Sequence, residues 1–137
     1  MNKLYRPASL LMTIIFAIVG LIFFFIPSRL IIFFNQLSAY LGMKQAPVIG
    51  TNFFLILAVA YMYLVALLAF LMYRNPESRA FPMLLAHAKI ASSVLSFVIF
   101  VVHQPYLIYL TNGIIDGLIG VIVIYLYFIH FKKRISS

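Results

Sequence analysis

Long apolar runs with almost no charge dominate this chain. Of its 137 residues, 66% are hydrophobic and only 9% are charged. Soluble domains are on average about half apolar and about a quarter charged, so a water-soluble fold of this length could not bury that much apolar surface. We therefore expect lipid to be the solvent for most of the chain, and we predict an all-α polytopic membrane protein.

Four segments are long enough to cross a bilayer as helices. About 20 predominantly apolar residues are needed to span a hydrocarbon core of about 30 Å. Polar loops and prolines separate the four segments from one another. We predict a four-transmembrane-helix bundle, forming a single integral membrane domain over 1–137, with transmembrane helices over about 9–28, 52–73, 83–103 and 106–131.

Two of these helices have an ambiguous beginning. The first segment could be a cleaved signal peptide, but its apolar core is long for one and no small-x-small cleavage site follows it. We interpret it as an uncleaved first transmembrane helix. The fourth segment starts either at Pro105 or after Asn112-Gly113, and the residue pattern alone leaves both starts open.

Residues 30–43 are too few to span a membrane and too apolar for an ordinary loop. One helical face is apolar, and Asn35, Gln36 and Ser38 lie away from its centre; the face consists of Leu30, Phe33, Phe34, Leu37 and Leu41. Pro27-Ser28 predicts a helix start and Gly42 a helix end. We predict a short amphipathic helix in the membrane interface. The alternative is a bent continuation of the first span, because tilted spans vary in length.

Basic residues collect on one side of the predicted bundle. Four spans place both termini on the same side, which also carries most of the lysines and arginines: Lys3, Arg6, Arg74, Arg79, Lys132, Lys133 and Arg134. The other side carries Arg29 and Lys44. Because basic loops stay in the cytoplasm, we predict a cell inner-membrane protein with both termini cytoplasmic. The net charge of +8 is therefore explained by basic residues on one side of the lipid bilayer, and we expect no nucleic acid as partner.

The last two predicted helices form a hairpin in which each arm carries one charge, Lys89 and Asp116. If the hairpin turns at 103–105, Lys89 lies level with Gly120 and Asp116 level with Ser93, which offsets the charges by about 6 Å along the helices. A lysine side chain covers that distance. Its Cβ, however, tilts toward the cytoplasm, which favours snorkelling in that direction. A direct pair therefore remains open.

Small and polar residues accompany these charges at three- and four-residue spacing. The polar positions form a candidate intramembrane polar site: Lys89, Ser92, Ser93, Ser96, Asn112 and Asp116. The small positions predict close helix packing: Ala86, Gly113, Gly117 and Gly120. A charge at the centre of a spanning helix costs about 2.5–3.5 kcal/mol on insertion scales, so each charge needs a partner, water or an exit. One interpretation is a structural lock, or a snorkelling Lys89 with Asp116 near the outer interface. The other is a proton- or ion-responsive site.

Most catalytic and cofactor chemistry is not expected of this chain. It has no cysteine, and the intramembrane serines lack histidine–carboxylate partners at their depth. Two acidic residues do not suffice for carboxylate-based hydrolysis or calcium binding. The histidines lie at different depths, His87 and His130 about 12 Å apart, so we expect no haem or metal within one subunit. We expect His103 and His130 to lie at the membrane–water interface, and His87 to lie at the cytoplasmic mouth of the polar site.

Three functions fit this pattern, and we expect no cofactor. The leading hypothesis is a non-catalytic accessory or structural subunit that acts through helix packing, as a homo-oligomer or in a larger membrane complex. The second is a small oligomeric transporter or channel that uses the intramembrane pair of Lys89 and Asp116. The third is a quinone or lipid binder among Tyr61, Tyr63 and the polar site. For these tyrosines we expect a hydroxyl partner on a neighbouring helix, with packing favoured over ligand contact.

Overall fold

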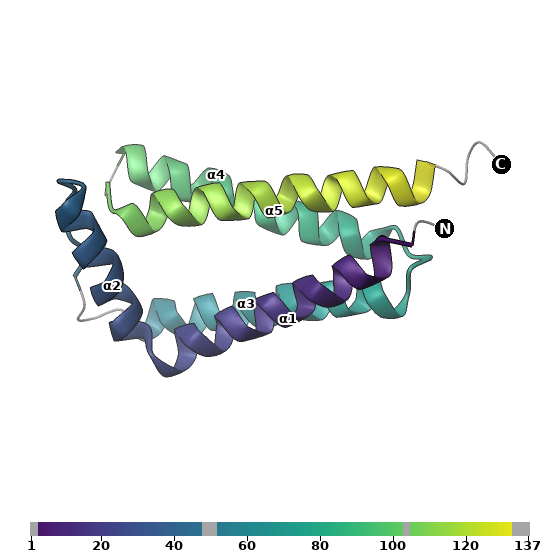
Figure 1. The fold of residues 1–137 in the computed structure, drawn as a ribbon, viewed down its shortest axis with the longest axis horizontal. Helices are drawn as coiled ribbons and strands as arrows, with labels where there is room; N and C mark the ends of the chain where they lie inside the picture. The colour runs from purple at the N-terminus through teal and green to yellow at the C-terminus, as the bar shows by residue number, and fades with distance from the viewer. Residues whose placement is uncertain (1–2, 48–51, 103–104, 133–137) are drawn as a thin grey trace.

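A computed structural model of the chain describes residues 3–47, 52–102 and 105–132. These residues form five helices and no strand. In chain order they are α1 (Tyr5–Phe25), α2 (Pro27–Tyr40), α3 (Asn52–Arg74), α4 (Ala80–Val102) and α5 (Leu107–Lys132) (Figure 1). Four of them, α1, α3, α4 and α5, are long and apolar enough to cross a membrane. The prediction of an all-α, multi-pass architecture is thereby confirmed.

Prolines set the helix boundaries that the sequence left least certain. Ile26 leaves the helical conformation at φ −133° and ψ 47°, because Pro27 disfavours a helical residue before it. Pro27 then takes the first turn of α2, where its missing N–H is not needed. At the other ambiguous position α5 already begins at Leu107, so the later start, after Asn112-Gly113, is wrong.

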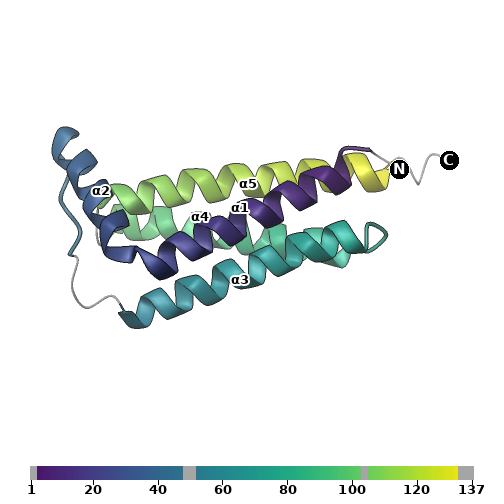
Figure 2. The ribbon, with the colours of Figure 1, turned by 60° about the horizontal axis from the view of Figure 1, so that its bottom comes forward.

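The long helices pair as two antiparallel hairpins, α1 with α3 and α4 with α5 (Figures 1 and 2). The first hairpin is held by apolar side chains, among them Met12 and Phe16 on α1 and Val65 and Ala69 on α3, all of them buried. Contact between the hairpins is much less extensive than contact within them. The few side chains that reach from one hairpin to the other therefore decide how the bundle is assembled.

One such contact lies where α1 starts, α5 ends and α3 connects to α4, which we name the terminal end (Figure 1). There the ring of Tyr5 stacks on His130, with centroids 4.0 Å apart. His130 Nε2 lies 2.8 Å from the carbonyl oxygen of Pro76 and donates to it, since a carbonyl can only accept. His130 lies at the terminal end and is only 2% exposed, so at this end it is enclosed by protein. Its cover comes from α1, which is remote in sequence.

Helix α2 lies across the opposite end of the bundle (Figures 1 and 2). Ser38 is its buried side chain, and Asn35 clamps the following segment by bonding the backbone N and O of Ala46 at 2.7 and 2.8 Å. Gly42 ends the turn at φ +66°, as predicted, with the Met43 N–H donating back to Ser38 O at 2.9 Å. Phe33, Leu37 and Leu41 from the predicted apolar face are exposed.

Several predicted features lie outside the described residues. They are the turn of the last hairpin at 103–104 and the basic residues Lys133 and Arg134.

Candidate functional site

Glycines let α4 and α5 approach closely. A Cβ atom at Gly117 would lie 2.9 Å from Ser93 Oγ, and one at Gly120 would lie 2.9 Å from Ile90 Cγ1. The predicted register placed Ser93 level with Asp116 and Lys89 level with Gly120, so it is correct to within one residue. Both contacts are shorter than real Cβ atoms make, and the seam between the two helices therefore depends on glycine at these positions.

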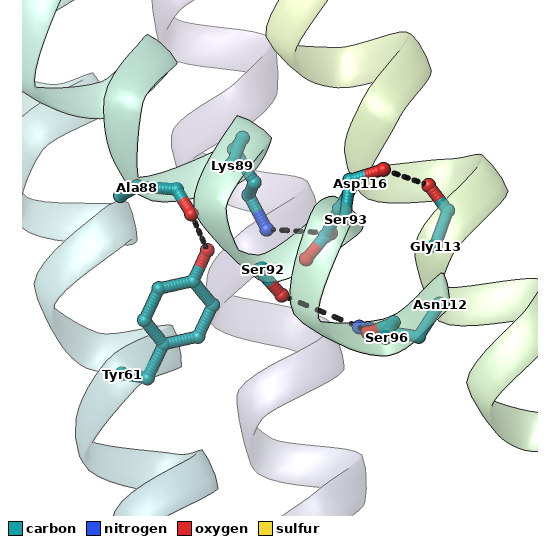
Figure 3. Close-up of polar contacts among 9 residues, drawn as sticks. All are labelled: Tyr61, Ala88, Lys89, Ser92, Ser93, Ser96, Asn112, Gly113 and Asp116. Atoms are coloured by element: carbon teal, nitrogen blue, oxygen red, sulfur yellow. Dashed lines mark hydrogen bonds and ion pairs between the residues drawn. The ribbon is translucent and has the colours of Figure 1, made fainter. Parts of the chain in front are cut away.

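Lys89 and Asp116 form a direct ion pair inside the bundle. Lys89 Nζ lies 3.0 Å from Asp116 Oδ1, and the two residues are 2% and 5% exposed (Figure 3). The sequence left this pairing open and favoured snorkelling of Lys89 toward the nearer end of its helix. Snorkelling does not occur, because neighbouring helices cover the lysine and the carboxylate lies within its reach.

Two aromatic rings complete the surroundings of the lysine. Its Nζ lies 4.6 Å from the ring centroid of Phe16 on α1 and 5.2 Å from that of Tyr61 on α3. A cation over an aromatic face at such distances is attracted by the ring quadrupole, most strongly where water is excluded. With Asp116 on α5, the ammonium of an α4 residue thus contacts all three of the other long helices. We name Phe16, Tyr61, Lys89 and Asp116 the lysine cluster.

Sequence reasoning missed Phe16. The signal available was depth, because Phe16 and Lys89 lie at similar distances from the helix ends that meet at the terminal end. That signal is weak in a chain with 14 phenylalanines.

Tyr61 also joins the hairpins through its hydroxyl. The hydroxyl donates to the carbonyl oxygen of Ala88, 3.2 Å away, one residue before Lys89 (Figure 3). This confirms the expected backbone partner on a neighbouring helix. Tyr63 differs, being 70% exposed, because a two-residue step turns it to the opposite side of α3. The structure therefore does not bring Tyr63 to the polar site.

The remaining polar positions bond across the α4–α5 seam. Ser93 Oγ donates to Gly113 O at 2.6 Å. The Asn112 amide donates to Ser96 Oγ at 2.7 Å and to Ser92 Oγ at 3.3 Å (Figure 3). Every residue of the candidate polar site is thus engaged in a contact between these two helices, which replaces hydrogen bonds that lipid cannot offer.

The predicted packing residues are buried, whereas His87 is not. Ala86 on α4 belongs to the apolar core cluster, and Gly113 and Gly120 on α5 are buried in the seam. His87 is exposed, and its Nδ1 donates to Met83 O at 2.7 Å. The expected place of His87 at the mouth of the polar site is wrong, because its two-residue separation from Lys89 turns it to the other side of α4.

Chemically, the lysine cluster is a paired charge in a close-packed, water-poor place. The ammonium has one carboxylate oxygen and two ring faces around it, and the adjoining seam has no room for a side chain at Gly117. This arrangement resists separation of the helices more than it offers a reactive group.

Comparison with known protein families, curated proteins and solved structures finds no match to the chain.

We predict that Phe16 and Lys89 are energetically coupled. Phe16→Leu should lose about 1–2 kcal/mol of unfolding free energy beyond its packing loss, because the desolvated cation–π contact disappears. Unfolding in detergent with increasing denaturant measures this loss in wild-type and Lys89→Met backgrounds. Phe24→Leu, at an exposed ring, is the matched control and should change little. If Phe16→Leu loses the same unfolding free energy in both backgrounds, to within about 0.5 kcal/mol, the coupling is contradicted.

Proposed function

We propose that this chain is a small integral protein of a cell inner membrane and has no enzymatic activity of its own. It acts through helix packing as an accessory or structural subunit, either as a homo-oligomer or within a larger membrane complex. In this proposal the lysine cluster is the lock that holds two hairpins in one arrangement, so that their outer faces present a fixed surface.

The observation that carries this proposal is the closure of the ion pair. Lys89 is 2% exposed and bonded, and aromatic rings occupy other sides of its ammonium. A site that passes ions or protons needs water, an open position or a relay of titratable groups. The titratable neighbour is Tyr61, whose hydroxyl proton is donated to the Ala88 carbonyl oxygen, and this engagement supports a static role.

The proposed topology follows from charge at the two ends of the bundle. At the terminal end, basic residues lie near the start of α1, in or beside the α3–α4 connection and at the end of α5. Among the residues that the structure describes they are Lys3, Arg6, Arg74, Arg79 and Lys132. The α2 end carries Arg29 and Lys44. By the positive-inside rule we place the terminal end, and hence both termini, in the cytoplasm.

Helix α2 then lies at the outer surface, and we propose that it rests in the lipid interface. Its protein-facing side carries the buried Ser38, whereas Phe33 and Leu37 on the other side are 57% and 42% exposed. An apolar face left open at the end of a spanning bundle is suited to the boundary between headgroups and acyl chains.

Single cysteines test this topology cleanly, because the chain has none of its own. In intact cells, Gln45→Cys at the α2 end should react with a membrane-impermeant maleimide added outside. Asn75→Cys, in the α3–α4 connection, should react only after the membrane is opened. Both positions are exposed, which makes them matched probes. Labelling in the reverse pattern would refute the orientation.

Flux measurements test the static role. Purified protein in liposomes should conduct protons and alkali ions no faster than protein-free liposomes, and Asp116→Asn and Lys89→Met should leave that background unchanged. Circular dichroism checks that each variant is folded. A wild-type flux that Asp116→Asn abolishes in a folded protein would refute the proposal and identify a transporter or channel that uses the pair.

A further inference from the structure

A second feature of the hairpin lies on the side away from the polar site. It is an open groove of about 710 Å³ between α4 and α5. Its lining is almost wholly apolar and includes the small Ala91 on α4 and the large rings of Tyr127 and Phe128 on α5. His87 lines it as well, its ring held by the bond from Nδ1 to Met83 O. A groove of this kind on a spanning hairpin has acyl chains as its solvent.

The groove is long enough to take an acyl chain through one leaflet. On α4 its lining runs from Pro82, in the first turn, to Leu95, which at 1.5 Å per residue is about 20 Å. Half of a hydrocarbon core of about 30 Å is about 15 Å. The groove therefore starts at the terminal end and reaches about two-thirds of the way along α4, somewhat deeper than one leaflet, which is long enough to hold an acyl chain of that leaflet along its length.

Positive charge lies at the mouth of the groove. The guanidinium of Arg79, three residues before Pro82, lies 5.4 Å over the ring of Phe131, and Phe131 is one turn beyond Tyr127 and Phe128. This contact holds the cation at the end of the hairpin where the groove begins. Lys132, which ends α5, is exposed at the same end. The charge at this mouth is complementary to a phosphate group.

We propose that the groove binds one anionic phospholipid of the adjacent leaflet, with an acyl chain along Ala91 and the phosphate at Arg79. The assignment of that leaflet as cytoplasmic rests on the orientation proposed above. The binding itself does not, because groove and cation belong to the same end of one hairpin. Binding in detergent, where no leaflets exist, can therefore fail or succeed independently of the topology and of the static role.

Native mass spectrometry of the full chain in detergent tests this site with added phosphatidylglycerol and phosphatidylcholine. We expect wild type to retain one phosphatidylglycerol in preference to phosphatidylcholine. Arg79→Gln should weaken phosphatidylglycerol binding about fivefold, the effect of removing one cation near the headgroup. Ala91→Phe, which fills an exposed part of the groove, should reduce binding of both lipids, and the smaller Ala91→Leu should reduce it partly.

Matched controls separate the groove from general effects. Arg74→Gln removes the same charge at the terminal end but from α3, and Ala17→Phe adds the same ring to an exposed position of α1. Both should bind phosphatidylglycerol as wild type does. Equal retention of the two lipids by wild type, or equal loss in Arg79→Gln and Arg74→Gln, would overturn the proposal. So would a dimer that Ala91→Phe dissociates, since a second copy would then occupy the groove.

Discussion

The ammonium of Lys89 is the group on which the arrangement of the helices depends. Transferring a charged amine out of water costs several kcal/mol, and a partner must offset that cost with good geometry. Here the carboxylate of Asp116 lies 3.0 Å away, and the rings of Phe16 and Tyr61 face the same nitrogen. Each partner comes from a different helix. Moving any one of the four long helices would leave the charge less well compensated.

Such a device is suited to a protein dissolved in lipid. Between membrane helices the hydrophobic effect gives little preference for one arrangement, because acyl chains are as apolar as leucine side chains. Each hairpin has its own means of close packing: apolar side chains between α1 and α3, and glycines with serine hydrogen bonds between α4 and α5. The two hairpins share fewer contacts with each other. The polar groups between them stabilise one relative position of the hairpins over slightly shifted positions. Stacking of Tyr5 on His130 adds a second fixed point at the terminal end.

Local patterns explain what the sequence could predict. Hydrophobic length located the four spans, Pro27 and Gly42 located the ends of α2, and the turn of the last hairpin gave its register to within one residue. These features depend on residues close in the chain. The beginning of α1 at Tyr5, before the predicted position 9, has its reason elsewhere: Tyr5 is buried against His130 and Phe131 of α5.

Two of the missed features are contacts between the two hairpins. Phe16 over Lys89 and the burial of His130 depend on which face of one hairpin meets the other. Helices that are apolar on every side carry no amphipathic signal for that choice. The polar site itself was predictable, because intramembrane charge at three- and four-residue spacing from serines and glycines is rare. The position of the Phe16 ring over Lys89 was not predictable.

A double-mutant cycle on the ion pair tests the account most directly. The free energy of unfolding in detergent would be measured for wild type, Lys89→Met, Asp116→Asn and the double variant. If the pair is a lock, each single variant loses about 3–5 kcal/mol, because it leaves a buried group uncompensated, and the double variant recovers most of that loss. If the double variant loses the sum of the two single losses, or if neither single variant loses stability, the lysine cluster does not hold the bundle together.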